Sequence, residues 1–171
     1  MNIVSKFTVG SDEGIDNLFD VIRPSVSSLY KELVPKEDIK NYIQHLDRRK
    51  VINELNDLSN QLIMTYQDEQ PIGYSILKTG SRYPGLLEEK RATEFSFVIL
   101  QEYDSPEARQ SHWKKCRAAV AFTDVIWINM LINDPLLDFL KESGFSVAEE
   151  THSGPFQLPS YLLTMDITKG T

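Results

Sequence analysis

The sequence predicts a mixed α/β fold in which one sheet carries helices on both faces. Some segments have an apolar residue at every second position, as half-buried strands do, and others repeat apolar residues with helical spacing. Their order is one strand, several helices, three strands, a helix, a strand, a helix and two strands, which is too irregular for a doubly wound sheet. Residues 1–171 contain no internal repeat, low-complexity segment or linker, so we expect a single domain.

The first third of the chain predicts a strand followed by helices. Residues 3–9 alternate apolar and polar side chains, which indicates a strand. Helical spacing begins at Ile15 and continues, in two or three pieces, to Leu58. We expect Pro24 to end the first helix, because proline has no N–H group for the helical hydrogen bond.

The middle of the chain predicts a hairpin and then a longer strand. Residues 61–66 and 72–76 alternate on either side of a turn, which is typical of a hairpin. A polar connection over residues 80–91 follows, and its pattern is compatible with a lid, a partner surface or a disordered segment. Residues 93–101 alternate again and predict the fourth strand.

The last third predicts two helices and three strands. Residues 105–107 read Ser-Pro-Glu, a cap, a first-turn proline and a first-turn acid that open a helix. Residues 125–130 form a short apolar strand, and the next helix covers 134–144, where the final glycine fits a left-handed cap. The last strands are expected over 145–148 and 161–167.

Composition excludes several classes of function. The chain carries 18 basic and 25 acidic residues, a formal charge of −7, which argues against a nucleic-acid partner. No apolar run approaches the roughly 18 residues of a membrane span, so we expect no membrane partner. The single cysteine and three scattered histidines predict neither a disulfide nor a metal site. The polar, alternating start resembles no secretory signal, so a cytoplasmic location is expected.

Two local motifs, together with the order of the elements, carry a family resemblance. The hairpin contains Pro-Ile-Gly-Tyr-Ser-Ile over residues 71–76, and residues 133–145 read Asn-Asp-Pro-Leu-Leu-Asp-Phe-Leu-Lys-Glu-Ser-Gly-Phe. In this arrangement the chain resembles the GNAT family of acyl-CoA-dependent N-acyltransferases. The resemblance implies a mostly antiparallel sheet whose fourth and fifth strands, here 93–101 and 125–130, splay apart.

The resemblance also implies a reaction and its partners. Acetyl-CoA would lie in the gap between the splayed strands, and the acceptor would be an amine of a small molecule or a protein. A base removes the amine proton and an acid protonates the leaving thiolate. Family members are often dimers, so the resemblance further implies a homodimer.

The resemblance assigns roles to particular residues. The expected catalytic groups are a carboxylate and two phenols: Glu94, Tyr103 and Tyr161. The expected contacts to the cofactor come from both splayed strands and the helices after them: Val98, Leu100, Ser105, Ala108, Arg109, Asn133 and Phe139.

Several of the candidate residues also have a plainer interpretation. Glu94 fits a solvated carboxylate at a strand start, and Asn133 fits an ordinary helix-start turn. Tyrosines beside strands usually pack. His112 and Cys116 share a helical face, which suits a catalytic pair but more often a core stripe.

Two departures from the family pattern argue against activity. Residues 101–109, the expected phosphate loop, hold no glycine, and Pro106 has no N–H to offer a phosphate. The same segment carries three carboxylates, which would repel a diphosphate. Leu140 stands where the family has its acid. The sequence therefore supports two hypotheses: an N-acetyltransferase with a degenerate phosphate loop, and an inactive binding module that kept the fold.

Overall fold

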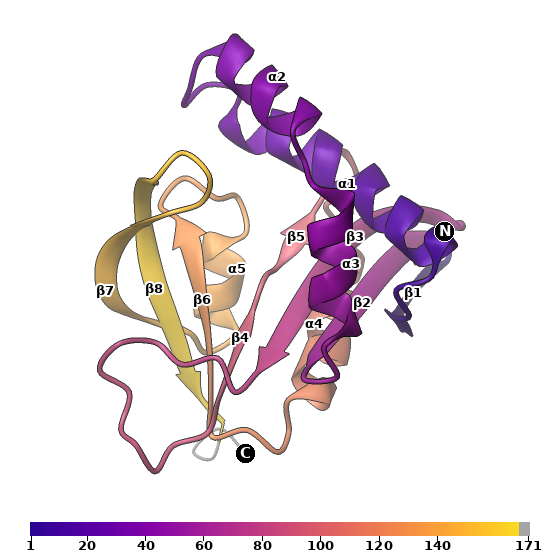
Figure 1. Cartoon of the computed structure of the whole chain (residues 1–171). Coiled ribbons are helices and arrows are strands. Elements are labelled where there is room, and N and C mark those ends of the chain that lie inside the picture. Colours follow the sequence, from indigo (N-terminus) through magenta and orange to yellow (C-terminus); the bar gives the residue numbers. More distant parts are fainter. Residues whose placement is uncertain (168–171) are drawn as a thin grey trace.

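The computed structural model describes residues 1–167 (Figure 1). Helices and strands succeed one another along the chain in almost the predicted order. They are β1 (Ile3–Thr8), α1 (Asp12–Tyr30), α2 (Lys36–Gln44), α3 (Arg48–Asn56), β2 (Asn60–Gln67), β3 (Gln70–Thr79), β4 (Ala92–Phe95), β5 (Val98–Ile99), the 3₁₀ turn η1 (Gln101–Tyr103), α4 (Pro106–Ala119), β6 (Val125–Leu131), α5 (Leu137–Glu142), β7 (Ser146–Ser153) and β8 (Leu158–Asp166).

One sheet runs through the molecule, in the order β1-β2-β3-β4-β6-β8-β7, with β5 paired to β3. Neighbouring strands are antiparallel except β4 and β6, which are parallel. The expected mixed α/β fold with a mostly antiparallel sheet is confirmed.

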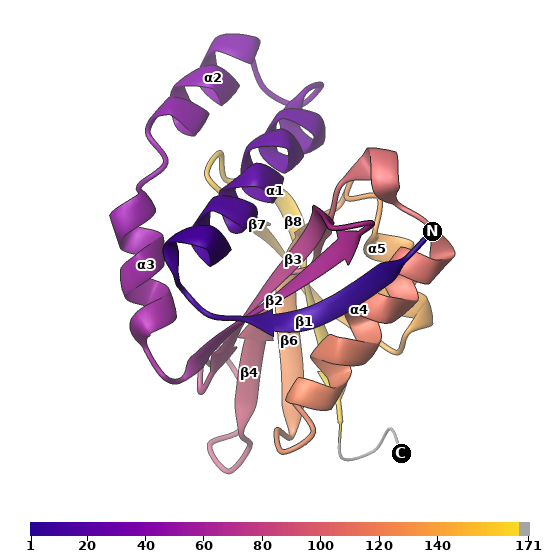
Figure 2. The same cartoon turned by 90° about the vertical axis from the view of Figure 1, so that its right-hand side faces the viewer.

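Helices cover both faces of this sheet (Figure 2). Helix α1 packs on β3 and α3 on β2, while α4 packs on β1, β2 and β3 from the other side. Phe139 and Leu140 of α5 join the core on the α4 side, together with Phe97 and Ile128 of the sheet. The helices therefore bury both faces of the central strands, as expected.

Helix α1 continues through Pro24, so the prediction that Pro24 ends it is wrong. Proline within a helix costs about 3 kcal/mol, because it removes one hydrogen bond and crowds the preceding turn. Leu18 and Val21 before Pro24 and Tyr30 after it are buried. This packing on both sides of the proline outweighs the local penalty.

The predicted strand over 93–101 is interrupted, so a single strand there is a wrong prediction. It forms β4 and β5, with Ser96 and Phe97 between them. Ser96 N donates to Ile76 O at 3.2 Å, and the Ser96 hydroxyl, in place of a carbonyl, accepts from Ile76 N at 2.9 Å. The side chain takes a backbone partner, which lets the strand bend here.

The bend separates β5 from β6. Residues Ala92 to Glu94 pair with Val125 to Trp127, but beyond them β5 pairs with β3 and β6 continues along β8 to Leu131. The expected splay between these two segments is confirmed.

The last hairpin is longer than predicted. Strand β7 extends to Ser153 and β8 starts at Leu158, whereas the sequence predicts strands only over 145–148 and 161–167. Most of β7 is exposed at the edge of the sheet, so its side chains show no alternating apolar pattern.

Within residues 1–167, no helix combines the length and apolar character that crossing a bilayer requires. In the same part of the chain, no three His, Cys, Asp or Glu side chains gather where they could hold a metal ion.

Candidate functional site

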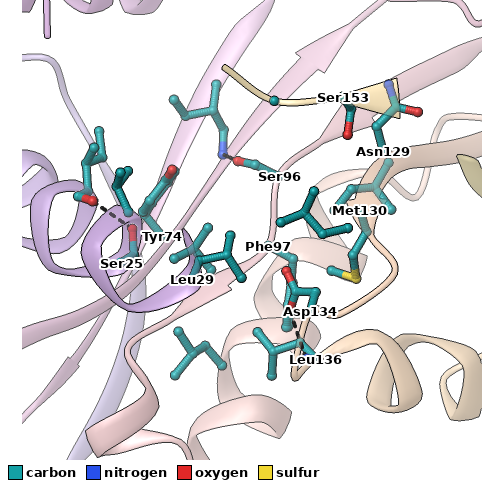
Figure 3. A pocket seen from close by; sticks show the side chains of 18 of the residues that line it. Ser25, Leu29, Tyr74, Ser96, Phe97, Asn129, Met130, Asp134, Leu136 and Ser153 are labelled. Atoms are coloured by element: carbon teal, nitrogen blue, oxygen red, sulfur yellow. Dashed lines mark hydrogen bonds between the residues drawn. The ribbon is translucent and has the colours of Figure 1, made fainter. Parts of the chain in front are cut away.

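A cavity of about 520 Å³ lies where β5 and β6 part (Figure 3). Side chains from both faces of the sheet line it, for example Ser96 and Val98 from the α1 side and Phe97 and Met130 from the α4 side. The cavity therefore passes through the gap between the strands. Helices α1, α2 and α3, the segment between β6 and α5, and the β7–β8 turn contribute its other lining residues.

Backbone groups of Phe97 and of Ile99 in β5 face this gap. In an antiparallel ladder alternate residues turn their N–H and C=O groups toward the partner strand. Ser96 N and Leu100 N donate to Ile76 O and Ile72 O of β3, so the groups of Phe97 and Ile99 face away from β3. These amides can bind an extended chain that carries its own amide groups.

Glu94 lines the cavity at the point where the strands part. Ser81 Oγ donates to Glu94 Oε1 at 2.7 Å, and Trp127 Nε1 donates to Ser81 O at 2.8 Å. Residues 80–91, which contain Ser81, are held in turn by Arg82, whose guanidinium donates to the carbonyls of Leu87 (2.7 Å) and Lys90 (2.6 Å). The connection is an ordered brace that positions the carboxylate.

Four carboxylates and one lysine are among the lining residues. Glu54 Oε1 lies 3.0 Å from Lys78 Nζ, so the opposite charges of these two side chains cancel. Asp134 Oδ1 accepts from Leu136 N at 2.8 Å, and burial raises the pKa of Asp134 to about 6. The balance of the cavity is negative, which favours cationic ligands.

Three tyrosines also line the cavity: Tyr30, Tyr42 and Tyr74. Burial raises the pKa of Tyr30 to about 12 and that of Tyr74 still further, so both phenols stay protonated at neutral pH. They can donate hydrogen bonds but are poor sources of a proton. Sequence reasoning did not single them out, because alternating or helical tyrosines are ordinary packing residues.

Comparison of the sequence with known families and proteins gives no match, whereas comparison of the fold with solved structures gives many. No family model matches the sequence, and no curated protein does. PaiA N-acetyltransferase from Thermoplasma acidophilum, in complex with coenzyme A, has a TM-score of 0.73 at 17% identity, over 97% of this chain and 99% of its own. The chain has the fold of the GNAT N-acetyltransferases.

Further structures agree with this assignment of the fold. Aminoglycoside N(6′)-acetyltransferase from Legionella pneumophila has a TM-score of 0.65 at 16% identity, over 99% of this chain and 95% of its own. YncA from Salmonella typhimurium, with its cofactor acetyl-CoA, has a TM-score of 0.69 at 12% identity, over 98% and 95%. Nearly every element of the GNAT fold is therefore present.

Three of the predicted site residues meet at the cavity. Glu94, Val98 and Leu100 are all among its lining residues. They come from the two segments of the fourth GNAT strand, whose even-numbered residues share the α1 face.

The other predicted catalytic residues lie elsewhere, outside the set of lining residues. Tyr103 packs against the cluster beneath α1. Tyr161 packs against the opposite core, with Lys141 Nζ 5.5 Å from its ring centroid. Their roles as acids stay predictions.

Asn133 and Phe139, two of the predicted cofactor contacts, are also outside the lining set. Asn133 is exposed after β6. Phe139 is buried and stacks on Phe97, with ring centroids 5.9 Å apart. Their predicted contacts with the cofactor stay untested.

The first turn of α4 holds the remaining predicted contacts. Ser105 Oγ accepts from Ala108 N at 3.1 Å, and the Ala108 side chain is buried. Arg109 donates to both carboxylate oxygens of Asp104, at 2.6 and 2.9 Å. Pro106 is the first helical residue. The amides and the guanidinium that would meet a phosphate are therefore partly engaged already.

His112 and Cys116 belong to the core. His112 is fully buried, with Nδ1 2.6 Å from Thr65 Oγ1 and Nε2 2.7 Å from Ser75 Oγ. Burial lowers the pKa of His112 to about 4 and raises that of Cys116 to about 12. A neutral imidazole cannot stabilise a thiolate, so the interpretation of this stripe as core is confirmed.

Proposed function

We propose that the protein is an acyl-CoA-dependent N-acyltransferase that transfers an acetyl group from acetyl-CoA to a primary amine of a small molecule or a protein. The observation that carries the proposal is the cavity between β5 and β6, which joins outward-facing strand amides to a braced carboxylate. When bound, acetyl-CoA would supply a thioester whose carbonyl carbon forms a bond to the amine nitrogen as its bond to sulfur breaks. The products are an amide and free CoA.

The residues at the gap suit the arm of this cofactor. The backbone groups of Phe97 and Ile99 would hold its amides, and Val98 and Leu100 would contact its apolar carbons. The backbone N–H of Phe97, at the bend, would also suit the negative charge that develops on the thioester carbonyl oxygen during attack.

Glu94 is the proposed base. Its carboxylate lines the cavity, and the hydroxyl of Ser81 holds one of its oxygens, leaving the other for the proton of the attacking amine. Leu140 is buried in the core, so no acid stands at the family's position. The leaving thiolate would take its proton from solvent.

The competing candidate is a binding module without turnover. The favouring observation is the first turn of α4, where Arg109 is bound to Asp104 and Pro106 lacks an N–H. Glu107 adds negative charge to the same turn, and Glu102 adds it to the preceding turn η1. We infer a degenerate phosphate site that holds the diphosphate weakly.

Calorimetry with acetyl-CoA at low salt, followed by mass spectrometry of amine products, tests the proposal. Micromolar binding with an acetylated product supports the transferase. Micromolar binding without any product across an amine panel supports the binding module instead. Millimolar or absent binding overturns the transferase.

A further inference from the structure

An aromatic bridge joins the two sides of the cavity. Phe156, in the β7–β8 turn, contacts Tyr30 at the end of α1 and Tyr42 in α2, with ring centroids 5.0 and 5.8 Å apart. Both contacts are edge-on, the favoured geometry for aromatic pairs. The bridge therefore ties the turn to the helical pair above it.

The bridge is closely packed. A Cβ on Gly154 would lie 2.7 Å from Tyr30 Oη, so only glycine fits at this contact without a shift. Ile39 and Leu131 are buried in the same cluster as Tyr30. A packed wall of this kind, unlike an exposed loop, resists opening.

The bridge forms one wall of the cavity. Tyr30 and Tyr42 line the cavity, as do Gly154 and the following proline. In Figure 3, Leu29 of α1 lies across the space from Asn129 of β6. An acceptor must therefore fit between α1 and the sheet, in the space that Tyr30 and Tyr42 also line.

This wall has a consequence for the size of the acceptor. A lysine within a protein has chain on both sides, and this chain must find open surface at the mouth of the cavity while the side chain enters it. On the side of the bridge, Tyr30, Tyr42 and Gly154 line the cavity, and Phe156 packs on both tyrosines and leaves less surface there for such a chain. A free small amine needs no such groove.

The charges lining the cavity limit the chemistry of the acceptor. Lys78 is the one cationic residue among the described lining residues, and its Nζ is bound to Glu54 at 3.0 Å. Asp104 is paired with Arg109, whereas within residues 1–167 Glu94 and Asp134 accept hydrogen bonds from uncharged donors only. The lining attracts an ammonium group and offers no free cation to a carboxylate or phosphate.

We propose that the acceptor is a small primary amine with an apolar body and no acid group, and that lysines of folded proteins or peptides are excluded. This inference rests on the proposed function for its catalytic part. The observations that carry it are the aromatic bridge and the two lining carboxylates without a cationic partner.

Three probes test the inference on the wild-type protein. Phenethylamine and phenylalanine share one apolar body and differ in the carboxylate, and a lysine-containing peptide represents a protein acceptor. With acetyl-CoA, we expect kcat/KM for phenethylamine to exceed that for each of the others at least tenfold. Equal or better use of phenylalanine or of the peptide would overturn the inference.

Opening the bridge tests its role directly. Phe156→Ala should raise kcat/KM for the peptide at least tenfold relative to phenethylamine, and the milder Phe156→Leu should act in the same direction. Phe122→Ala, at an exposed phenylalanine outside the lining set, is the matched control and should leave kcat/KM unchanged for both the peptide and phenethylamine. If the Phe156→Ala and Phe156→Leu proteins fold and keep the wild-type ratio of kcat/KM for the peptide to that for phenethylamine, the bridge does not exclude protein acceptors.

Binding without the cofactor separates failure of this inference from failure of the proposed function. Calorimetry on the cofactor-free protein should give phenethylamine at least tenfold tighter binding than phenylalanine. If acetyl-CoA does not bind but phenethylamine still binds at least tenfold more tightly than phenylalanine, the transferase proposal is wrong, while the preference for a small apolar amine without an acid group is supported. Absence of phenethylamine binding, or an equal affinity for phenylalanine, overturns the ligand class.

Discussion

The hydroxyl of Ser81 lies 2.7 Å from a carboxylate oxygen of Glu94, across the point where the sheet begins to divide. The two residues are 13 positions apart, and the ordered connection over 80–91 brings them together. A hydrogen bond to one oxygen restrains the side chain of Glu94, which lines the cavity, and leaves its second oxygen available to a ligand.

Glu94→Gln should lower kcat about 100- to 10,000-fold, which is the usual contribution of a positioned base. The amide keeps an oxygen for Ser81, so we expect folding and acetyl-CoA affinity to be unchanged. Steady-state thiol release measures kcat, and calorimetry measures the affinity for acetyl-CoA. Ser81→Ala should lower kcat less, and Glu89→Gln, at an exposed glutamate of the same connection, should leave it intact. A Glu94→Gln enzyme with wild-type kcat would remove Glu94 from the mechanism.

Asp104→Asn should strengthen acetyl-CoA binding about tenfold, because it removes a carboxylate and releases Arg109 from its bidentate ion pair. Glu107→Gly should act in the same direction if the diphosphate reaches this turn. Pantetheine, which lacks the diphosphate, is the control ligand, and calorimetry should give it the same affinity for all three proteins. Unchanged acetyl-CoA affinity in both variants would show that the phosphates do not visit α4.

Asp134 and His112 oppose one another in the pH dependence of stability. Burial raises the pKa of Asp134 from 3.8 to about 6, so as the pH falls from 6 to 4 the folded state gains a proton first and is stabilised. Burial lowers the pKa of His112 from 6.5 to about 4, so over a similar window the unfolded chain gains a proton first and stability is lost. The two effects partly cancel in the wild-type protein.

Asp134→Asn should therefore expose the acid sensitivity of His112. At pH 7 the variant should be more stable by on the order of 2 kcal/mol, because a desolvated charge is gone and the amide oxygen still accepts from Leu136 N. Between pH 7 and pH 4.5 it should lose stability more steeply than the wild type. Urea denaturation at both pH values measures this. Asp20→Asn, at an exposed helical carboxylate, is the control and should leave the pH dependence of the free energy of unfolding as in the wild type. A wild-type pH dependence in Asp134→Asn would show that Asp134 does not offset His112.

Cys116 should not react with a thiol reagent in the native protein. Its thiol is buried and its pKa is raised to about 12, so almost no thiolate is present at pH 8. Dithionitrobenzoate absorbance should report one thiol only after unfolding in guanidinium chloride. Rapid labelling of the folded protein would revive a cysteine-dependent mechanism.

Local patterns predicted most of the elements. The hairpin over 61–66 and 72–76 is confirmed within β2 and β3, and the helix opened by residues 105–107 is α4. Pro24 and the exposed strand β7 were mispredicted for the same reason. Packing partners far along the chain decide both, and these partners leave no trace in the local pattern.

The site was predicted less completely than the fold. Glu94, Val98 and Leu100 could be placed together because they have the same parity along residues 93–101, and the interruption at Ser96 and Phe97 preserves their shared face. Tyr30, Tyr74 and Asp134 come from three separate elements, and no spacing in the sequence relates them.

By itself the sequence determined most of the strands and helices, because hydrophobic periodicity is a local property of the chain. It also determined the charges near α4, since residue types do not depend on the fold. Only the tertiary structure decided that Ser96 bends the fourth strand away from β6, that a cavity opens there, and that Phe156 packs on two of the tyrosines that line it. Those features depend on contacts between residues far apart in the chain, which form only when the sheet and its helices assemble.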